Sequence, residues 1–143
     1  MKAYYAFPLK AGRLMNAGKQ PDIRLKGSVK GFIRVLLKTH LTEYRFDDSF
    51  GCYMWDQDYQ NIKSLSLWEN ELEDQVSNLI GRNEGRLQQV RVRVTVEKNV
   101  AHHHIPVSQR LLHRINIRVY GWLPRTGDRF IQQEYIYFSP LII

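Results

Sequence analysis

The residues best suited to take part in a reaction are carboxylates in the segment after the first apolar stretch. Glu43 is followed by Asp47 and Asp48, with Arg45 and several aromatic side chains among them. Glycoside hydrolysis needs two carboxylates about 5–9.5 Å apart across a sugar cleft. Arg45 favours the ionised form of Glu43, however, whereas the general acid of that reaction must carry a proton. A glycoside hydrolase is therefore an alternative hypothesis, and we predict that the protein is not an enzyme.

Histidines and acids elsewhere in the chain could bind a metal ion. His102, His103 and His104 are consecutive, so their side chains point in different directions and cannot easily share one ion. Asp56 and Asp58 lack the glycine and the closing glutamate of a calcium-binding loop. We therefore expect no metal and no cofactor, and we interpret the histidine cluster as a solvated loop between two strands.

The single cysteine, Cys52, cannot form a disulfide within the chain, which fits the reducing cytosol. A thiol can act as a nucleophile, but one beside Gly51 is more readily explained as a small packed side chain. No apolar run approaches the roughly 18 residues that a membrane helix needs. We therefore expect a cytoplasmic protein without direct membrane insertion.

The net charge of +7 is unevenly distributed along the chain. Residues 1–31 and 82–143 are basic, whereas residues 43–74 are rich in acids. A basic chain can bind nucleic acid, and a nucleic-acid-binding module is a second alternative hypothesis. The alternation of basic and acidic regions instead favours electrostatic complementarity with protein partners. We therefore expect no nucleic-acid partner.

Two amphipathic helices are expected to position these residues. The first spans about 28–40 with Ser28 as its N-cap, and its apolar stripe consists of Val29, Phe32, Ile33, Leu36 and Leu37. In the second, at about 66–80, Ser66 and Glu69 form a capping box and Gly81 follows as the C′ residue. The apolar stripe of this helix consists of Trp68, Leu72, Val76, Leu79 and Ile80.

From Leu87 the hydrophobic period changes to that of a β-strand. Alternating apolar and polar residues predict strands at about 89–97, 113–122 and 129–138. We therefore predict an α+β fold, with two helices packed on a three-stranded antiparallel sheet.

The first residues show no sustained period and several glycines and prolines. We interpret residues 1–26 as an N-terminal extended arm, with a short strand at about Tyr4–Leu9. Residues 27–143 then form a single domain, since a chain of 143 residues is long enough for one core but not for two.

The segment from Thr39 to Trp55 alternates charged and aromatic residues, which are costly to bury together unless each charge has a partner. It resembles the signature of the phage tail-lysozyme-like baseplate family in Thr39, Glu43-Tyr44-Arg45-Phe46-Asp47, Phe50-Gly51-Cys52 and Trp55. The similarity is closest to the TssE-type branch of type VI secretion systems from Bacteroidetes. Leu41 and Thr42 stand where that branch has Phe-Gly, and a glycine there permits a tight turn.

A second motif supports the resemblance, which spans about Ser28 to Leu141. Glu84-Gly85-Arg86 stands where the family has Glu-Pro-Arg after its second helix, so both charges are kept. The resemblance implies a structural baseplate component of a contractile injection machine, located in the cytoplasm near the inner membrane. The expected partners are wedge proteins of the TssF and TssG type and sheath proteins of the TssB and TssC type.

The resemblance also implies which residues contact each partner. The residues expected at the wedge or core interface are Glu43, Arg45, Phe50, Gly51, Glu84 and Arg86. A sheath subunit is expected to add a strand to an exposed sheet edge, because backbone donors and acceptors recognise another strand whatever its side chains. The last strand has high β-propensity and no internal proline, and the residues expected at this edge are Gln133, Tyr135 and Tyr137.

Overall fold

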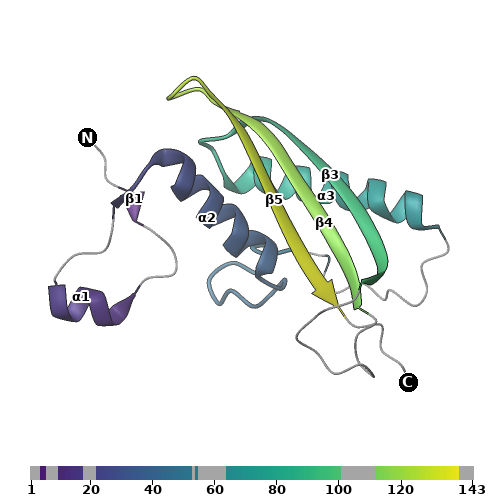
Figure 1. Ribbon diagram of the computed structural model, residues 1–143, viewed down its shortest axis with the longest axis horizontal. Helices are drawn as coiled ribbons and strands as arrows, with labels where there is room; N and C mark the ends of the chain where they lie inside the picture. The colour runs from purple at the N-terminus through teal and green to yellow at the C-terminus, as the bar shows by residue number, and fades with distance from the viewer. Residues whose placement is uncertain are drawn as a thin grey trace.

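Two long helices and a three-stranded antiparallel sheet make up most of this computed structural model (Figure 1). It describes residues 4–5, 10–17, 22–52, 54, 64–100 and 112–138. The elements are, in chain order, β1 (Tyr4–Tyr5), α1 (Ala11–Ala17), β2 (Asp22–Ile23), α2 (Leu25–Lys38), α3 (Leu65–Asn83), β3 (Gln88–Val100), β4 (Leu112–Leu123) and β5 (Asp128–Phe138). The predicted α+β class is confirmed, and the two predicted helices and the three predicted strands of the sheet are found.

The sheet has the order β3-β4-β5, so β4 is central and the other two strands form its edges. Val94 pairs with Ile117, and Ile117 pairs with Glu134 on the third strand. These three residues therefore share one face of the sheet, because residues paired across strands point to the same side. That face is covered by the two helices, with α3 beside β3 and α2 beside β5 (Figure 1).

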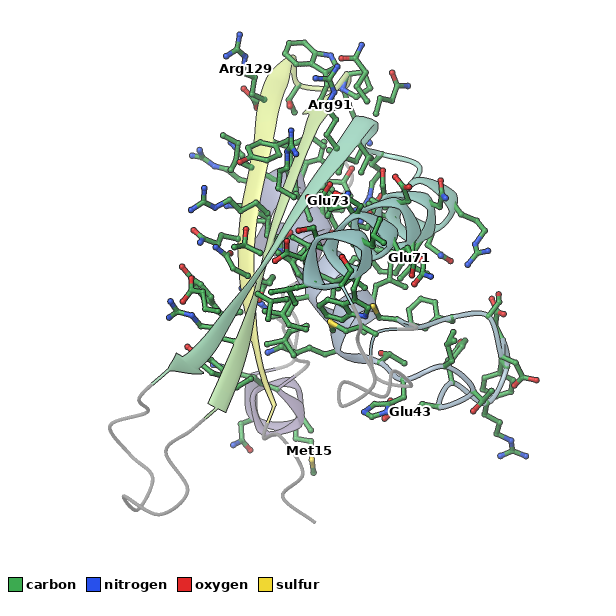
Figure 2. All side chains as sticks on the ribbon, turned by 90° about the vertical axis from the view of Figure 1, so that its right-hand side faces the viewer. Met15, Glu43, Glu71, Glu73, Arg91 and Arg129 are labelled. Carbon is green, nitrogen blue, oxygen red and sulfur yellow. The ribbon has the colours of Figure 1, made fainter. Side chains whose placement is uncertain are left out.

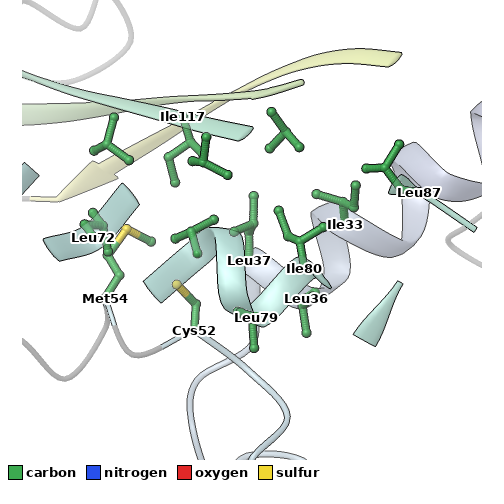
Figure 3. Close-up of a cluster of buried hydrophobic side chains, with 14 of the residues drawn as sticks. Ile33, Leu36, Leu37, Cys52, Met54, Leu72, Leu79, Ile80, Leu87 and Ile117 are labelled. Carbon is green, nitrogen blue, oxygen red and sulfur yellow. The ribbon is translucent and has the colours of Figure 1, made fainter. Parts of the chain in front are cut away.

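The hydrophobic core lies between this face and the helices (Figure 3). Both predicted apolar stripes point into it, with only Phe32 left partly exposed. Cys52 and Met54, from the segment after α2, are also buried there, so the predicted packed thiol is present. Within the described residues, no helix is long and apolar enough to cross a membrane.

The helix starts differ from the predicted ones. Helix α2 begins at Leu25, and Arg24 is its N-cap without a side-chain hydrogen bond. Ser28 therefore lies inside the helix, buried, and its hydroxyl accepts a hydrogen bond from Arg86 Nη1 at 2.8 Å. The prediction of Ser28 as N-cap is wrong, because the apolar stripe continues one turn further back to Leu25, which is buried in the core.

Helix α3 also departs from its predicted ends. Its N-cap is Ser64, whose hydroxyl accepts a bond from the amide of Leu67, so Ser66 is not the cap. The side chain of Glu69 bonds to β3 instead of closing a capping box. Gly81 lies within the helix, and the C-cap is Glu84. Tertiary contacts of the glutamate and of the helix end therefore override the local capping signals.

The N-terminal region contains the short antiparallel pair β1–β2, in which Tyr4 lies opposite Ile23. It also contains the seven-residue helix α1, which the sequence pattern did not predict. Part of the predicted strand at Tyr4–Leu9 lies outside the described residues. In the described part of the chain, β1 and β2 pair only with each other and not with the main sheet.

Candidate functional site

The end of α3 carries a buried ion pair between Glu84 and Arg86. Two guanidinium nitrogens, Nε and Nη2, lie 2.8 and 2.7 Å from the two carboxylate oxygens, which makes the pair bidentate. The amide of Arg86 also donates to Glu84 Oε1 at 3.1 Å. The Glu84 side chain is only 3% exposed, whereas that of Arg86 is 34% exposed. The hydrogen bonds to Glu84 raise the pKa of Arg86, so the guanidinium stays charged.

This ion pair joins four parts of the fold. Arg86 donates to the hydroxyl of Ser28 in α2, and its guanidinium lies 5.6 Å from the centre of the Tyr4 ring in β1. The hydroxyl of Tyr4 in turn accepts a bond from Arg125 Nη1 at 2.8 Å, in the turn between β4 and β5. Glu84 and Arg86 therefore hold α2, the end of α3, the N-terminal pair and the β4–β5 turn together.

The segment after α2 forms a loop that is closed at its base. Residues His40 and Cys52 form an isolated parallel bridge, and the amide of Cys52 donates to Thr39 O at 2.8 Å. Gly51 sits at this closure with φ of +130°, and a Cβ built on it would lie 2.5 Å from His40 O. Gly51 is therefore required by both its backbone conformation and the close approach of the opposite chain.

Thr42, in the same loop, has a φ of +66°. It stands where the TssE-type branch has a glycine, which adopts a positive φ readily. A β-branched residue with positive φ is unusual because its Cβ clashes with the backbone. The tight turn is thus kept without the glycine that normally permits it. The loop consists of turns and bends.

Glu43 stabilises this loop from within. Its Oε2 accepts a hydrogen bond from the amide of His40 at 2.7 Å, which ties the Glu43 side chain to the backbone of the loop. Among the described residues, no ion pair joins Glu43 to Arg45. The guanidinium of Arg45 instead lies 5.9 Å from the centre of the Phe46 ring.

Asp47, another of the three candidate carboxylates, serves a similar role. The hydroxyl and amide of Ser49 donate to its Oδ1 at 2.6 and 2.9 Å. These bonds hold the pKa of Asp47 below its usual value. A general acid needs a raised pKa, so the environment of Asp47 is opposite to the one that glycoside hydrolysis requires.

An aromatic cluster projects from the loop. Phe50 is half-buried, and its ring centre lies 6.1 Å from that of Phe32 in α2 and 5.2 Å from that of Tyr44. Tyr44 and Phe46 are 5.7 Å apart in an edge-to-face arrangement. Phe46 is 80% exposed and Tyr44 is 45% exposed. Sequence reasoning assigned neither residue to an interface, although their alternation with charged residues was a signal against burial.

A cavity of about 270 Å³ lies between this loop and α3. Leu41 and Cys52 line it from the loop, and Val76, Leu79 and Arg82 line it from the helix. The walls are mostly apolar, and their polar side chains are Gln75, Asn78 and Arg82. The cavity is large enough for a protein side chain and lies beside the same loop as the exposed aromatic pair.

The β3 edge of the sheet is closed by α3. Glu73 Oε1 accepts a hydrogen bond from the backbone N–H of Val94 at 3.0 Å, and Glu69 Oε1 accepts one from Val96 at 2.8 Å. Figure 2 shows Glu73 on the side of α3 that faces the sheet. Both amides point away from β4, so the two carboxylates take the place that a further strand would occupy.

The β5 edge is open by comparison. In antiparallel strands, the backbone groups of successive residues point alternately to the two neighbours. Because the amide of Val94 points away from β4, its partner Ile117 bonds to Glu134 on β5. The alternate residues of β5 therefore direct their backbone N–H and C=O groups outward, and they are Ile131, Gln133, Tyr135 and Tyr137. In the described residues no strand pairs with this edge.

Metal binding is not supported in the described part of the chain, where no group of three or more His, Cys, Asp or Glu residues converges. The cluster His102–His104 and the pair Asp56 and Asp58 lie outside the described residues.

The helix-backed sheet is shared with two solved structures. A Geobacter sulfurreducens protein named after tail lysozyme aligns with a TM-score of 0.59 at 16% identity, covering 85% of this chain and 97% of that one. A chain of the baseplate complex from the type VI secretion system aligns with a TM-score of 0.51 at 15% identity, covering 78% of this chain and 92% of that one. At these identities the two alignments show a shared fold. A search among curated proteins found no match.

The sequence itself defines the family. Residues 23–123 match the family model of the baseplate wedge protein gp25. The chain therefore belongs to the gp25 family of baseplate wedge proteins, and its role in the baseplate is a structural one. This agrees with the family resemblance of the Thr39–Trp55 and Glu84–Arg86 motifs.

Proposed function

We propose that this protein links wedge subunits to the sheath of a contractile injection machine and initiates sheath polymerisation by strand pairing. The asymmetry of the sheet edges carries the proposal. The β3 edge is occupied by Glu69 and Glu73, whereas β5 directs the backbone groups of Gln133 and Tyr135 outward. An open edge of high β-propensity is an aggregation hazard unless it has a partner, so an incoming strand is its natural occupant.

The loop after α2 is proposed to bind the wedge. Arg45, Tyr44 and Phe46 present charge and aromatic surface to solvent, a composition that is enriched at protein interfaces. Glu43, Phe50 and Gly51 fix the loop that carries them. Glu84 and Arg86 are proposed to contribute through the junction that they hold and through the exposed third of the arginine.

We further propose a TssE-like subunit of a type VI secretion system as the particular protein. The wedge partners would then be of the TssF and TssG type, and the sheath partners of the TssB and TssC type. Assembly would take place in the cytoplasm near the inner membrane. The motif from Thr39 to Trp55 supports this choice over other contractile machines.

The proposed role needs no catalysis. The lowered pKa of Asp47 and the use of Glu43 as a backbone anchor support a structural task for both carboxylates. Purified protein is expected to leave peptidoglycan intact in a muramidase assay. Release of soluble fragments that stops in Glu43→Gln would return the hydrolase hypothesis.

Replacing Gln133 by proline tests strand pairing. Proline removes one outward amide donor and is tolerated at a sheet edge. The matched control is Gln133→Ala, which keeps the amide but loses the side-chain bonds to Asn116 and Tyr135. We expect both variants to fold and to bind wedge protein, and only the proline variant to lose sheath polymerisation on the baseplate. Normal sheaths on folded Gln133→Pro would refute initiation at this edge.

A further inference from the structure

The face of the sheet opposite the helices carries a cluster of arginine and aromatic side chains. We call it the arginine face, and its residues are Arg91, Arg93, Arg118, Tyr120, Trp122, Arg129 and Ile131. The four arginines are exposed, and Ile131 is 56% exposed. Figure 2 shows Arg91 and Arg129 at the same end of the sheet, away from the helices.

The other half of the same sheet face is internally satisfied. Arg114 forms an ion pair with Glu97, and its guanidinium lies 4.8 Å from the centre of the Tyr135 ring. Gln133 donates to Asn116 Oδ1 at 3.0 Å and to the hydroxyl of Tyr135 at 2.6 Å. These contacts between strands and along β5 pair Arg114, Glu97, Asn116, Gln133 and Tyr135 with one another.

The arginines of the arginine face have no comparable ion pairs within the described residues. In the described residues, no carboxylate forms an ion pair with Arg91, Arg93, Arg118 or Arg129. Arg93 and Arg118 are directly opposite each other on β3 and β4. Like charges directly opposite in an antiparallel sheet are destabilising. The fold alone therefore gains nothing from this pair, whereas an anionic partner would neutralise it.

The uncharged residues of the face indicate the class of that partner. Tyr120 and Trp122, together with arginine, are the side chains that protein interfaces concentrate at their energetic centres. Ile131 lies in one cross-strand row with Tyr120 and Arg91. An exposed aliphatic side chain offers nothing to phosphate groups but can be buried by an apolar side chain of another protein.

We infer that the arginine face is a docking surface for an acidic segment of a partner protein. Its carboxylates pair with Arg93, Arg118 and their neighbours, and its apolar side chains cover Ile131 and Trp122. This surface uses side chains on the sheet face, whereas strand addition uses the backbone edge of β5. The inference therefore does not depend on sheath initiation.

A direct binding assay tests the inference on the full chain. The probe is a labelled peptide of about ten residues, long enough for one strand, that alternates glutamate and leucine. A lysine–leucine peptide and a single-stranded DNA oligonucleotide serve as comparison probes. Fluorescence anisotropy at low salt and at about 0.5 M salt measures affinity and its electrostatic share.

The decisive variant is Arg93→Gln/Arg118→Gln, and its charge-matched control is Arg24→Gln/Lys26→Gln at the exposed start of α2. We expect the first pair of substitutions to lower the affinity for the acidic peptide by about tenfold or more, as for buried charge pairs at interfaces. Folding should stay intact, because the substitutions remove the repulsion between Arg93 and Arg118. The control should change affinity by less than about twofold, since surface charges distant from a site are screened. Adding Ile131→Ser to the Arg93→Gln/Arg118→Gln variant should lower the affinity for the acidic peptide further.

Three outcomes would overturn the inference. One is equal weakening by both variant pairs, which would mean that only net charge matters. Another is absence of binding to the acidic peptide at low salt. The third is tighter binding of the oligonucleotide than of the peptide, lost in Arg93→Gln/Arg118→Gln and unaffected by Ile131→Ser, which would assign the face to nucleic acid.

Discussion

The carboxylate of Glu73 accepts a hydrogen bond from the backbone amide of Val94, with 3.0 Å between Oε1 and N, at the border of the sheet where a further strand would bind. One turn later in α3, the hydroxyl of Ser77 donates to the carbonyl of Val90 at 3.4 Å. A single helix face thus satisfies both donors and acceptors of β3. The consequence is a sheet with one edge available to a partner, which gives any assembly on it a fixed direction.

Removing these carboxylates should open the closed edge. In Glu69→Ala/Glu73→Ala the amides of Val96 and Val94 lose their acceptors, and we expect unfolding to require about 1–3 kcal/mol less free energy. The exposed β3 edge should also cause concentration-dependent self-association, measured by light scattering after size exclusion. The control is Glu71→Ala, an exposed position on the same helix, and it should stay monomeric. Equal losses in the control would show that helix charge, and not edge closure, matters.

Thr42 offers a test of backbone strain. At a φ of +66° a β-branched residue is strained by roughly 1–2 kcal/mol relative to its preferred conformations. Thr42→Gly removes that strain but adds entropy to the unfolded chain, so we expect a net gain of about 0.5–1 kcal/mol. Urea unfolding measures this gain as a shift of the midpoint, provided that the slope of the unfolding free energy against urea concentration is unchanged. Thr42→Ala, which keeps a Cβ, should gain little, and an equal gain from alanine would contradict the argument.

The exposed aromatic pair is the sharpest probe of wedge binding. Tyr44→Ser/Phe46→Ser should leave stability within about 1 kcal/mol, because Phe46 is 80% exposed and Tyr44 is 45% exposed. Binding of wedge protein should fall by about tenfold or more if these rings are interface anchors. Leu67→Ser is the matched control, since Leu67 is 65% exposed on α3. Unchanged wedge affinity in the aromatic variant would exclude this patch.

The periodicity of the sequence was sufficient to predict the two long helices and the three strands of the main sheet, because each buried stripe has an unambiguous period. The polar positions were not predictable in the same way. The side chain of Glu69 has a local capping role available, and only the packing of α3 on β3 directs it to Val96. Likewise, Gln132 and Glu134 occupy the helix-facing side of β5 because α2 supplies Lys30 O and Arg34 as their partners.

The candidate site follows the same division. The motif residues Gly51 and Glu43 could be located from the sequence, and the structure gives each a physical reason. The closure of the β3 edge could not be derived, since it depends on two carboxylates whose partners lie more than 20 residues away. The exposure of Phe46 also depends on the path of the closed loop.

The last prediction concerns the coupling between Glu84 and Arg86. An ion pair between two exposed side chains contributes under about 1 kcal/mol. The Glu84–Arg86 pair differs, because the Glu84 side chain is only 3% exposed. Arg86→Ala leaves a buried carboxylate without its main partner, so we expect a loss of about 2–4 kcal/mol. Arg34→Ala is the control: it also breaks a pair, but Arg34 is 55% exposed and Glu134 keeps a bond from Gln132.

A double-mutant cycle separates the pair from its surroundings. Glu84→Gln/Arg86→Met should cost clearly less than the sum of the two single changes, because no buried charge remains, and a coupling energy of about 1.5–3 kcal/mol is expected. Urea unfolding of the four proteins measures it. Additive losses would mean that Arg86 acts mainly through its other two contacts. These are the hydrogen bond to the Ser28 hydroxyl and the cation–π contact with the Tyr4 ring. Wedge affinity should be compared only among variants that are fully folded at the assay temperature, since a loosened junction alone would move α2 and the loop that follows it.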